Sequence, residues 1–83
     1  MSQSPATPST ITFAGYGVYN STIDVTSQVA AAYTGGARVF QANNAWGDPA
    51  PGARKYLYIG WNSGGNDGSG VVGEGDNRGI VVP

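Results

Sequence analysis

Acid–base catalysis has few candidate side chains in this chain, which contains five carboxylates, one lysine and no histidine. General acid–base catalysis uses a positioned histidine, or a carboxylate or lysine whose pKa is shifted. Asp48, Asp67 and Asp76 each stand beside Gly, Pro or Asn, where aspartate commonly forms turns, and Asp24 precedes a predicted helix. Glu74 could form a hydrolytic carboxylate pair with one of these residues, but turn formation already accounts for the aspartates, and a serine triad would lack its base. We therefore predict no catalytic residues and a protein that is not an enzyme.

Metal and phosphate chemistry have one candidate segment, residues 62–70, which is rich in glycine and side-chain oxygen atoms. A calcium site needs six to eight oxygen ligands, and this segment contains a single acidic residue, Asp67. It also lacks the Gly-Lys-Ser/Thr ending of a phosphate-binding loop. Two interpretations remain open, a calcium loop and a mobile hairpin loop, and composition favours the hairpin loop. Because cysteine and histidine are both absent, disulfides and zinc–thiolate sites are excluded, and we predict no cofactor and no required metal.

Aromatic side chains close to Asn and Asp indicate carbohydrate binding. A sugar presents an apolar C–H face and a rim of hydroxyl groups, so an aromatic ring can pack on the face while amides and carboxylates bond to the rim. One such group surrounds Trp46, a second surrounds Trp61 together with Asn66 and Asp67, and two tyrosines form a third aromatic surface. The candidate carbohydrate-binding residues are Asn43, Asn44, Trp46, Asp48, Tyr56, Tyr58, Trp61 and Asn62.

Each ring in this set has an alternative role in packing. Strand alternation places Trp61 on the same side as Leu57 and Ile59, so this ring can equally belong to the core. Trp46 lies in a loop rich in proline and glycine, where burial is less forced. Strand alternation places Tyr56 and Tyr58 on the other side from Leu57 and Ile59, where they can equally pack on the helix or on a second subunit.

Charge excludes two classes of partner. The net charge is −1, and charged residues make up 11% of the chain, below the roughly 25% that is typical of globular domains. The four cations are scattered along the chain, whereas nucleic-acid binders carry a basic patch or stripe. We predict no nucleic-acid binding and no insertion into a membrane, because no apolar run approaches the length of about 20 residues that spans a bilayer.

Hydrophobic periodicity predicts a mainly β chain with one short helix. Alternation over Thr10–Tyr16 predicts a strand with Ile11, Phe13 and Gly15 on one side. Asp24 or Thr26 can cap a helix that runs to about Tyr33. The remaining predicted elements are a turn with a short extended piece at 18–24, an extended segment at 37–42, a loop at 43–52, a strand at 54–62, a glycine-rich loop at 63–70, and two short strands at 71–72 and 79–82.

These elements predict a small β-sandwich or barrel-like sheet of about five or six strands with one short helix. The 83 residues indicate a single β-rich binding domain at 10–83, preceded by a flexible lead-in at 1–9. A domain of this size has a thin core and often needs a disulfide, a metal or a partner subunit. We therefore expect a homo-oligomer. The N-terminus shows no signal peptide, which predicts a cytoplasmic protein, and secretion of a processed form stays open.

Several short runs form a recognisable pattern: Tyr16-Gly17, Ile23-Asp24-Val25-Thr26 before a helix, and residues 43–52, which include a Gly-Asp-Pro-Ala-Pro-Gly run at 47–52, followed by Lys55-Tyr56-Leu57. This pattern resembles a small domain family found in bacteria and fungi and at the C-terminus of certain mitochondrial J-domain proteins. The ending, residues 74–83, is also similar. The resemblance covers roughly residues 11–83 and implies a β-rich accessory domain without catalytic residues. We expect the chain to depart from this pattern in having no partner domain.

The function predicted from these observations is that of a lectin, a carbohydrate-binding protein that recognises a neutral glycan as a homo-oligomer. Composition alone gives the chain a likeness to small fungal and bacterial lectins, which are also cysteine-free and rich in glycine and aromatic residues. The alternative is a protein-interaction or structural β domain, in which the 47–52 run is scaffold and the tyrosine surface is an interface.

Overall fold

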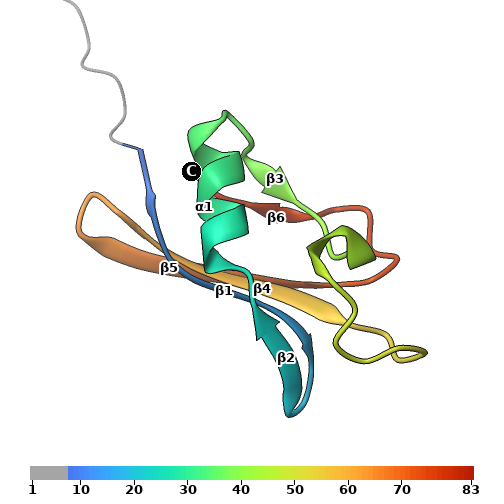
Figure 1. The fold of residues 1–83 in the computed structure, drawn as a ribbon. Helices are drawn as coiled ribbons and strands as arrows, with labels where there is room; N and C mark the ends of the chain where they lie inside the picture. The colour runs from blue at the N-terminus through green and yellow to red at the C-terminus, as the bar shows by residue number, and fades with distance from the viewer. Residues whose placement is uncertain (1–7) are drawn as a thin grey trace, which may run out of the picture.

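The computed structural model describes residues 8–83, so most of the predicted lead-in at 1–9 lies outside the described residues. The main element is a four-stranded antiparallel sheet (Figure 1). Its strands, in the order in which they lie side by side, are β2 (Ser21–Asp24), β1 (Thr10–Val18), β4 (Tyr56–Ser63) and β5 (Asn66–Gly73). The rest of the domain packs on one face of this sheet, the covered face, and leaves the other face, the open face, uncovered.

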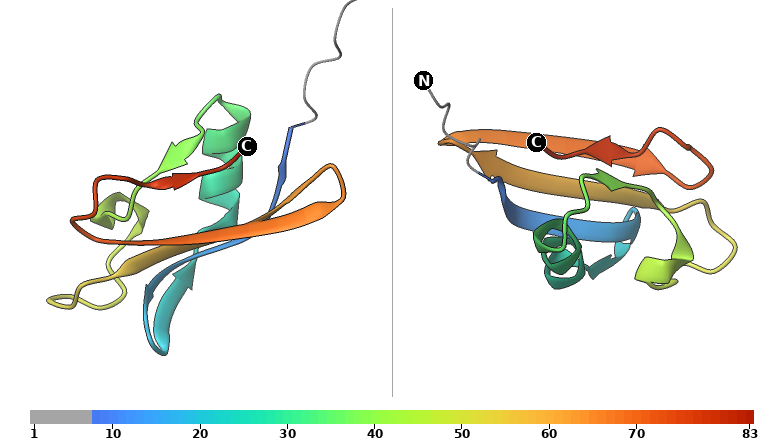
Figure 2. Two further views of the ribbon diagram at one scale, coloured as in Figure 1. Left: turned by 180° about the vertical axis from the view of Figure 1, so that it is seen from behind. Right: turned by 90° about the horizontal axis from the view of Figure 1, so that it is seen from above.

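A second layer covers one face of the main sheet. It consists of helix α1 (Thr26–Thr34), the antiparallel ribbon of β3 (Val39–Phe40) and β6 (Ile80–Val81), and the short 3₁₀ helix η1 (Asn44–Trp46). Figures 1 and 2 show the helix and the ribbon on the same side of the sheet. The predicted fold class is confirmed: residues 8–83 are mainly β, with six strands in two sheets and one short α-helix.

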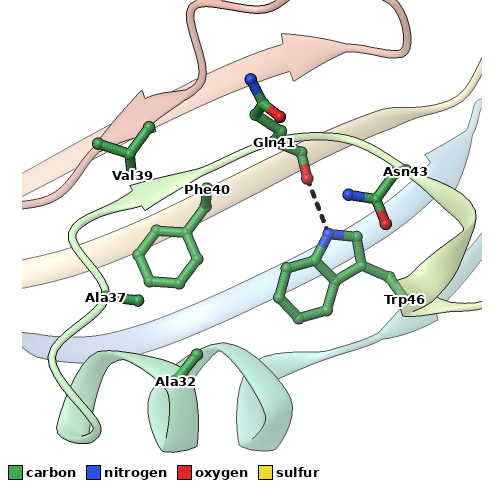
Figure 3. A pocket seen from close by; sticks show the side chains of 7 residues that line it. All are labelled: Ala32, Ala37, Val39, Phe40, Gln41, Asn43 and Trp46. Atoms are coloured by element: carbon green, nitrogen blue, oxygen red, sulfur yellow. Dashed lines mark hydrogen bonds between the residues drawn. The ribbon is translucent and has the colours of Figure 1, made fainter.

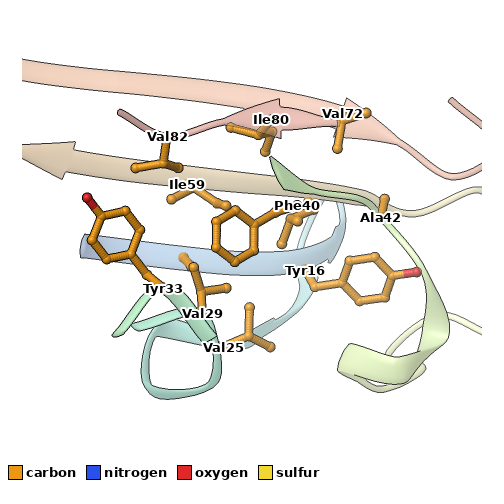
Figure 4. Packing of buried hydrophobic residues seen from close by; sticks show 12 residues of the cluster. Tyr16, Val25, Val29, Tyr33, Phe40, Ala42, Ile59, Val72, Ile80 and Val82 are labelled. Carbon is orange, nitrogen blue, oxygen red and sulfur yellow. The ribbon is translucent and has the colours of Figure 1, made fainter. Parts of the chain in front are cut away.

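The core fills the space between the two layers (Figure 4). Side chains alternate across a strand, and the register places Tyr16 opposite Leu57 and Ala14 opposite Ile59, all four of them buried. Helix α1 contributes Val29 at the sheet. The complete buried apolar cluster is Ala14, Tyr16, Val25, Val29, Tyr33, Phe40, Ala42, Leu57, Ile59, Val72, Ile80 and Val82.

Strand β1 differs from its predicted form in length and in alternation. The register with β4 shifts between Ile11 and Phe13. This bulge inserts one unpaired residue; Ile11 therefore packs against the core while Phe13 lies on the open face, and the prediction that they share a side was wrong. The strand also continues through Gly15 and Gly17 into a hairpin with β2, so 18–24 is strand, tight turn and strand.

The glycine-rich segment at 63–70 is a hairpin and not a loop, which corrects the prediction. Strands β4 and β5 pair without a break from Tyr56 opposite Gly73 to Ser63 opposite Asn66. Only Gly64 and Gly65 form the turn, with φ of 61° and 89°, the two positive angles of a type I′ turn. Residues 71–72, predicted as a separate strand, are the end of β5.

Side-chain hydrogen bonds fix the ends of the helix and of the chain. Asp24 Oδ1 accepts hydrogen bonds from the backbone N–H and the hydroxyl of Thr26, at 2.8 and 2.6 Å. The N-cap residue of α1 is Val25, which makes no side-chain cap hydrogen bond, so the prediction that Asp24 or Thr26 caps the helix was wrong. Buried Ser9 donates its backbone N–H to Tyr33 Oη at 2.8 Å and its hydroxyl to the Pro83 carbonyl at 2.8 Å. Ser9 is therefore packed into the domain, although the predicted lead-in included it. Within residues 8–83, no helix has the length and hydropathy of a membrane span.

Candidate functional site

The first candidate site is a hollow of about 450 Å³ between α1, β3 and η1. Apolar side chains from α1 and β3 form one side of it, and residues of the segment 41–46 form the other (Figure 3). The residues that line it are Ala32, Ala37, Val39, Phe40, Gln41, Asn43 and Trp46. All seven are uncharged, which suits a neutral polar ligand.

The Trp46 indole is held in place at this hollow. Its Nε1 donates a hydrogen bond to the backbone carbonyl of Gln41 at 2.9 Å (Figure 3). The ring packs partly against the core and remains half-buried. A ring fixed in this way loses little conformational entropy when a ligand packs on it.

Asn43 places an amide beside the indole (Figure 3). Its Oδ1 accepts a hydrogen bond from the Ala45 backbone N–H at 2.8 Å and so caps η1. Among the described residues no partner is found for its Nδ2 group. The side chain is therefore oriented by the cap and has a free N–H donor next to the ring.

Asn44 and Asp48, predicted in the same sugar site, have structural partners instead. Tyr16 Oη donates to Asn44 Oδ1 at 2.9 Å, and Asp48 Oδ1 lies 3.0 Å from the Lys55 ammonium. Asn43 and Trp46 thus line the same hollow, whereas Asn44 is hydrogen-bonded to the core residue Tyr16. Asp48 is an ion-pair residue, although the sequence indicated a turn former.

Lys55 anchors the loop at 47–52 from below. Its side chain is 3% exposed, and its Nζ contacts Asp48, Glu74 and the carbonyls of Ala50 and Ala53 at 2.8 to 3.3 Å. Burial by itself lowers the pKa of Lys55, but hydrogen bonds to the two carboxylates outweigh it and raise the pKa above its usual value. A buried ammonium must be paired in this way, so these charges hold the loop and are not available for chemistry.

Trp61 and Asn62, the second predicted group, lie near the turn of the β4–β5 hairpin. Trp61 packs partly against the core and its ring lies over Gly68, the cross-strand neighbour. Asn62 donates from Nδ2 to Asp67 Oδ1 at 3.0 Å and accepts from the Gly65 N–H at 3.2 Å. These polar groups pair across the hairpin, so the segment that was predicted as a loop consists of paired strands.

Tyr56 and Tyr58 lie on the open face of the sheet, opposite Leu57 and Ile59 as predicted. Tyr58 stacks on Phe13 with ring centroids 5.8 Å apart, and the Arg54 guanidinium lies 5.1 Å from the Tyr56 ring centroid. The Phe13–Tyr58 stack borders a second hollow of about 470 Å³. These tyrosines therefore belong to a surface separated by the sheet from Trp46.

Sequence reasoning missed Phe40, Gln41 and Ala32 at the first hollow and Phe13 and Val71 at the second. The alternation of 37–42 gave no indication that it would face the helix, because β3 has only two paired residues. With the bulge after Ile11 taken into account, alternation along β1 would have placed Phe13 on the same side of the sheet as Tyr58.

No protein-family model, curated protein or solved structure matches this chain. The resemblance to the J-domain-associated family therefore stays a prediction.

Proposed function

We propose that the protein is a carbohydrate-binding protein whose site is the hollow at Trp46. The observation that carries this proposal is the pairing of a fixed, half-buried indole with the free amide N–H of Asn43 in a hollow lined only by uncharged residues. A pyranose can pack its C–H face on the indole while Asn43 Nδ2 donates to a hydroxyl. The volume of about 450 Å³ lies in the range of roughly 300 to 1,000 Å³ that is usual for small-molecule sites.

The absence of charge in the lining also favours a neutral sugar over an anionic one. Arg38, which lies between the lining residues Ala37 and Val39, donates hydrogen bonds to the carbonyls of Tyr33 and Ala37, and Asp48 pairs with Lys55. An open site with a single ring and few polar groups gives weak binding, with a dissociation constant in the millimolar to micromolar range, or about −4 to −8 kcal/mol. Several linked sites would then be needed for useful avidity.

The test is binding of the wild type and Trp46→Ala to a glycan array and to immobilised neutral glycans. We expect wild-type binding to be lost in Trp46→Ala, since the platform is removed. Trp61→Ala is the matched control, because it removes a second half-buried indole at the hairpin. Circular dichroism checks that both variants are folded.

Asn43→Asp tests the polar half of the site. Aspartate can still accept the Ala45 N–H and cap η1, but it has no amide N–H to donate, so we expect weaker binding with an unchanged melting temperature. Wild-type protein that binds no glycan, or a folded Trp46→Ala that binds as well as wild type, would contradict the proposal.

The second candidate function is protein interaction through the open face of the sheet. The observation in its favour is the exposure of Phe13, Tyr56 and Val71 on that face, since aromatic residues are enriched at interfaces. A protein that binds no glycan but is retained by a protein partner through this face would indicate this function.

A further inference from the structure

Strand β5 is a long free edge of the main sheet. It pairs with β4 on one side, and no strand among the described residues pairs with its other side. It contains eight residues and follows β4 without a bulge. The opposite edge of the sheet, β2, has only four residues.

The hairpin geometry identifies which backbone groups face outward. In a two-residue type I′ hairpin, the residues that flank the turn, here Ser63 and Asn66, form a hydrogen-bonded pair. Hydrogen-bonded and non-hydrogen-bonded pairs then alternate along the ladder. The N–H and C=O groups of Asp67, Ser69 and Val71 therefore point away from β4, and within residues 8–83 they have no backbone partner.

This edge lacks the features that usually prevent strand pairing. Natural edges are protected by lysine, proline, bulges or short length. β5 contains no lysine or proline, and its single charged residue, Asp67, stands next to the hairpin turn. The edge also borders the apolar hollow on the open face, which is lined by Phe13, Tyr58, Ser69 and Val71 among others.

We propose that β5 pairs antiparallel with β5 of a second copy of this chain, around a two-fold axis at Ser69. In this register Ser69 lies opposite Ser69 of the second copy, and Asp67 lies opposite the second copy's Val71. All three outward-facing residues of each copy then gain hydrogen-bond partners, and the open face continues across an eight-stranded sheet.

Charge and symmetry both favour a second copy as the occupant. In this register four strand residues separate the two Asp67 side chains, roughly 13 Å, which exceeds the Debye length of about 8 Å at physiological salt. The contact is isologous, so it closes after two copies. It uses the β5 edge of each copy, and among the described residues the only edges of the main sheet that remain exposed are the short β2 strands. The inference does not depend on the proposed function, since no residue of β5 lines the hollow at Trp46.

The experiment is sedimentation velocity of the full chain over the micromolar to millimolar range, combined with amide hydrogen exchange. We expect a concentration-dependent dimer. Slower exchange of the Ser69 and Val71 amides should accompany dimer formation, because these N–H groups face solvent in the monomer.

Three variants locate the contact. Val71→Asp puts a carboxylate directly opposite Asp67 of the second copy, and like charges in opposite positions destabilise a strand pair; Ser69→Pro removes an outward N–H without removing a bond to β4. Each should weaken dimerisation about tenfold or more. Val81→Asp is the matched control, because Val81 on β6 is 64% exposed and Val71 is 66% exposed. It should leave the dimer unchanged.

A monomer at every concentration overturns the proposal and leaves the edge to an extended peptide. A dimer that survives Val71→Asp, or one that Val81→Asp weakens equally, also overturns it. If Ser69→Pro fails to fold, Val71→Asp and the exchange of the Ser69 amide still decide the question. Glycan binding is scored separately through Trp46, so failure of one proposal does not affect the reading of the other.

Discussion

The two faces of the main sheet are made by alternating residues of the same strands, yet they are built from different side chains. The covered face has Tyr16, Leu57 and Ile59, which are almost fully buried under α1 and the β3–β6 ribbon. The open face has glycine and aromatic residues, and the Tyr58 ring lies across Gly15 of the neighbouring strand. The covered face therefore supplies stability, while the open face supplies accessible surface. On the open face the Tyr58 ring occupies the space that a side chain at Gly15 would fill.

Adjacent valines in β5 give the largest expected difference between the two faces. Val72 is 5% exposed on the covered face, and Val71 is 66% exposed on the open face. Val72→Ala should lower the free energy of unfolding by about 2 kcal/mol, since it removes buried methyl groups and leaves a cavity. Val71→Ala should change it by less than about 0.5 kcal/mol.

Urea denaturation of dilute protein measures both values. Equal losses for the two valines would mean that the open face is covered in solution, and the comparison between the faces would have to be abandoned.

A smaller effect is expected for Gly15→Ala. A Cβ at Gly15 would lie 2.6 Å from Tyr58 Cε2, so the tyrosine ring must move and its stacking on Phe13 is disturbed. We expect a loss of about 1 kcal/mol in the free energy of unfolding, from overpacking and the lost aromatic contact.

The same substitution in a Tyr58→Ala background is the control. The three atoms nearest to the added Cβ all belong to the Tyr58 ring. Without that ring the alanine should be neutral or slightly stabilising, and the double-mutant cycle isolates the contact. A loss of equal size in both backgrounds would show that the ring is not the cause.

Period-two alternation was enough to predict the fold class and to separate the two sides of β4. It placed Trp61 with Leu57 and Ile59, and it placed Tyr56 and Tyr58 on the other side, as the structure has them. It failed at β1 because a single bulged residue after Ile11 reverses the sides. It also failed at β5, since glycine and polar residues that pair across a hairpin have the composition of a loop.

The candidate site was predictable only in part, because side-chain partners depend on contacts far apart in sequence. Trp46 and Asn43 were identified as a ring beside an amide, and the structure brings them together. Asn44 and Asp48 are polar residues of the same segment, but neither lines the hollow. Asn44 accepts a hydrogen bond from Tyr16, and Asp48 forms an ion pair with Lys55. Spacing along the chain contains no information about those two partners.

The smallest expected effect is the loss of stability at acid pH, which tests the contacts of Glu74 and Asp76. The Lys55 backbone N–H, which donates to Glu74 Oε1 at 2.8 Å, holds the pKa of Glu74 below its usual value. Hydrogen bonds from Arg78 lower the pKa of Asp76 to about 2. Because both values are lower in the folded protein, these groups stabilise it fully above the unfolded pKa values of 4.5 and 3.8, and the stabilisation is lost as pH falls through the folded values.

Melting temperatures should therefore stay level from neutral pH to about pH 4.5 and decrease towards about pH 2. The decrease should be modest, since both carboxylates lie at the surface, where solvent screens their interactions. Glu74→Gln keeps an oxygen that can accept the Lys55 N–H but removes one titrating group, so its profile should be flatter on the acid side. If Glu74→Gln keeps the full acid dependence, the ion pair between Glu74 and Lys55 does not link the loop to the sheet. The acid-sensitive contact is then the pair between Asp76 and Arg78, which lies outside the buried cluster.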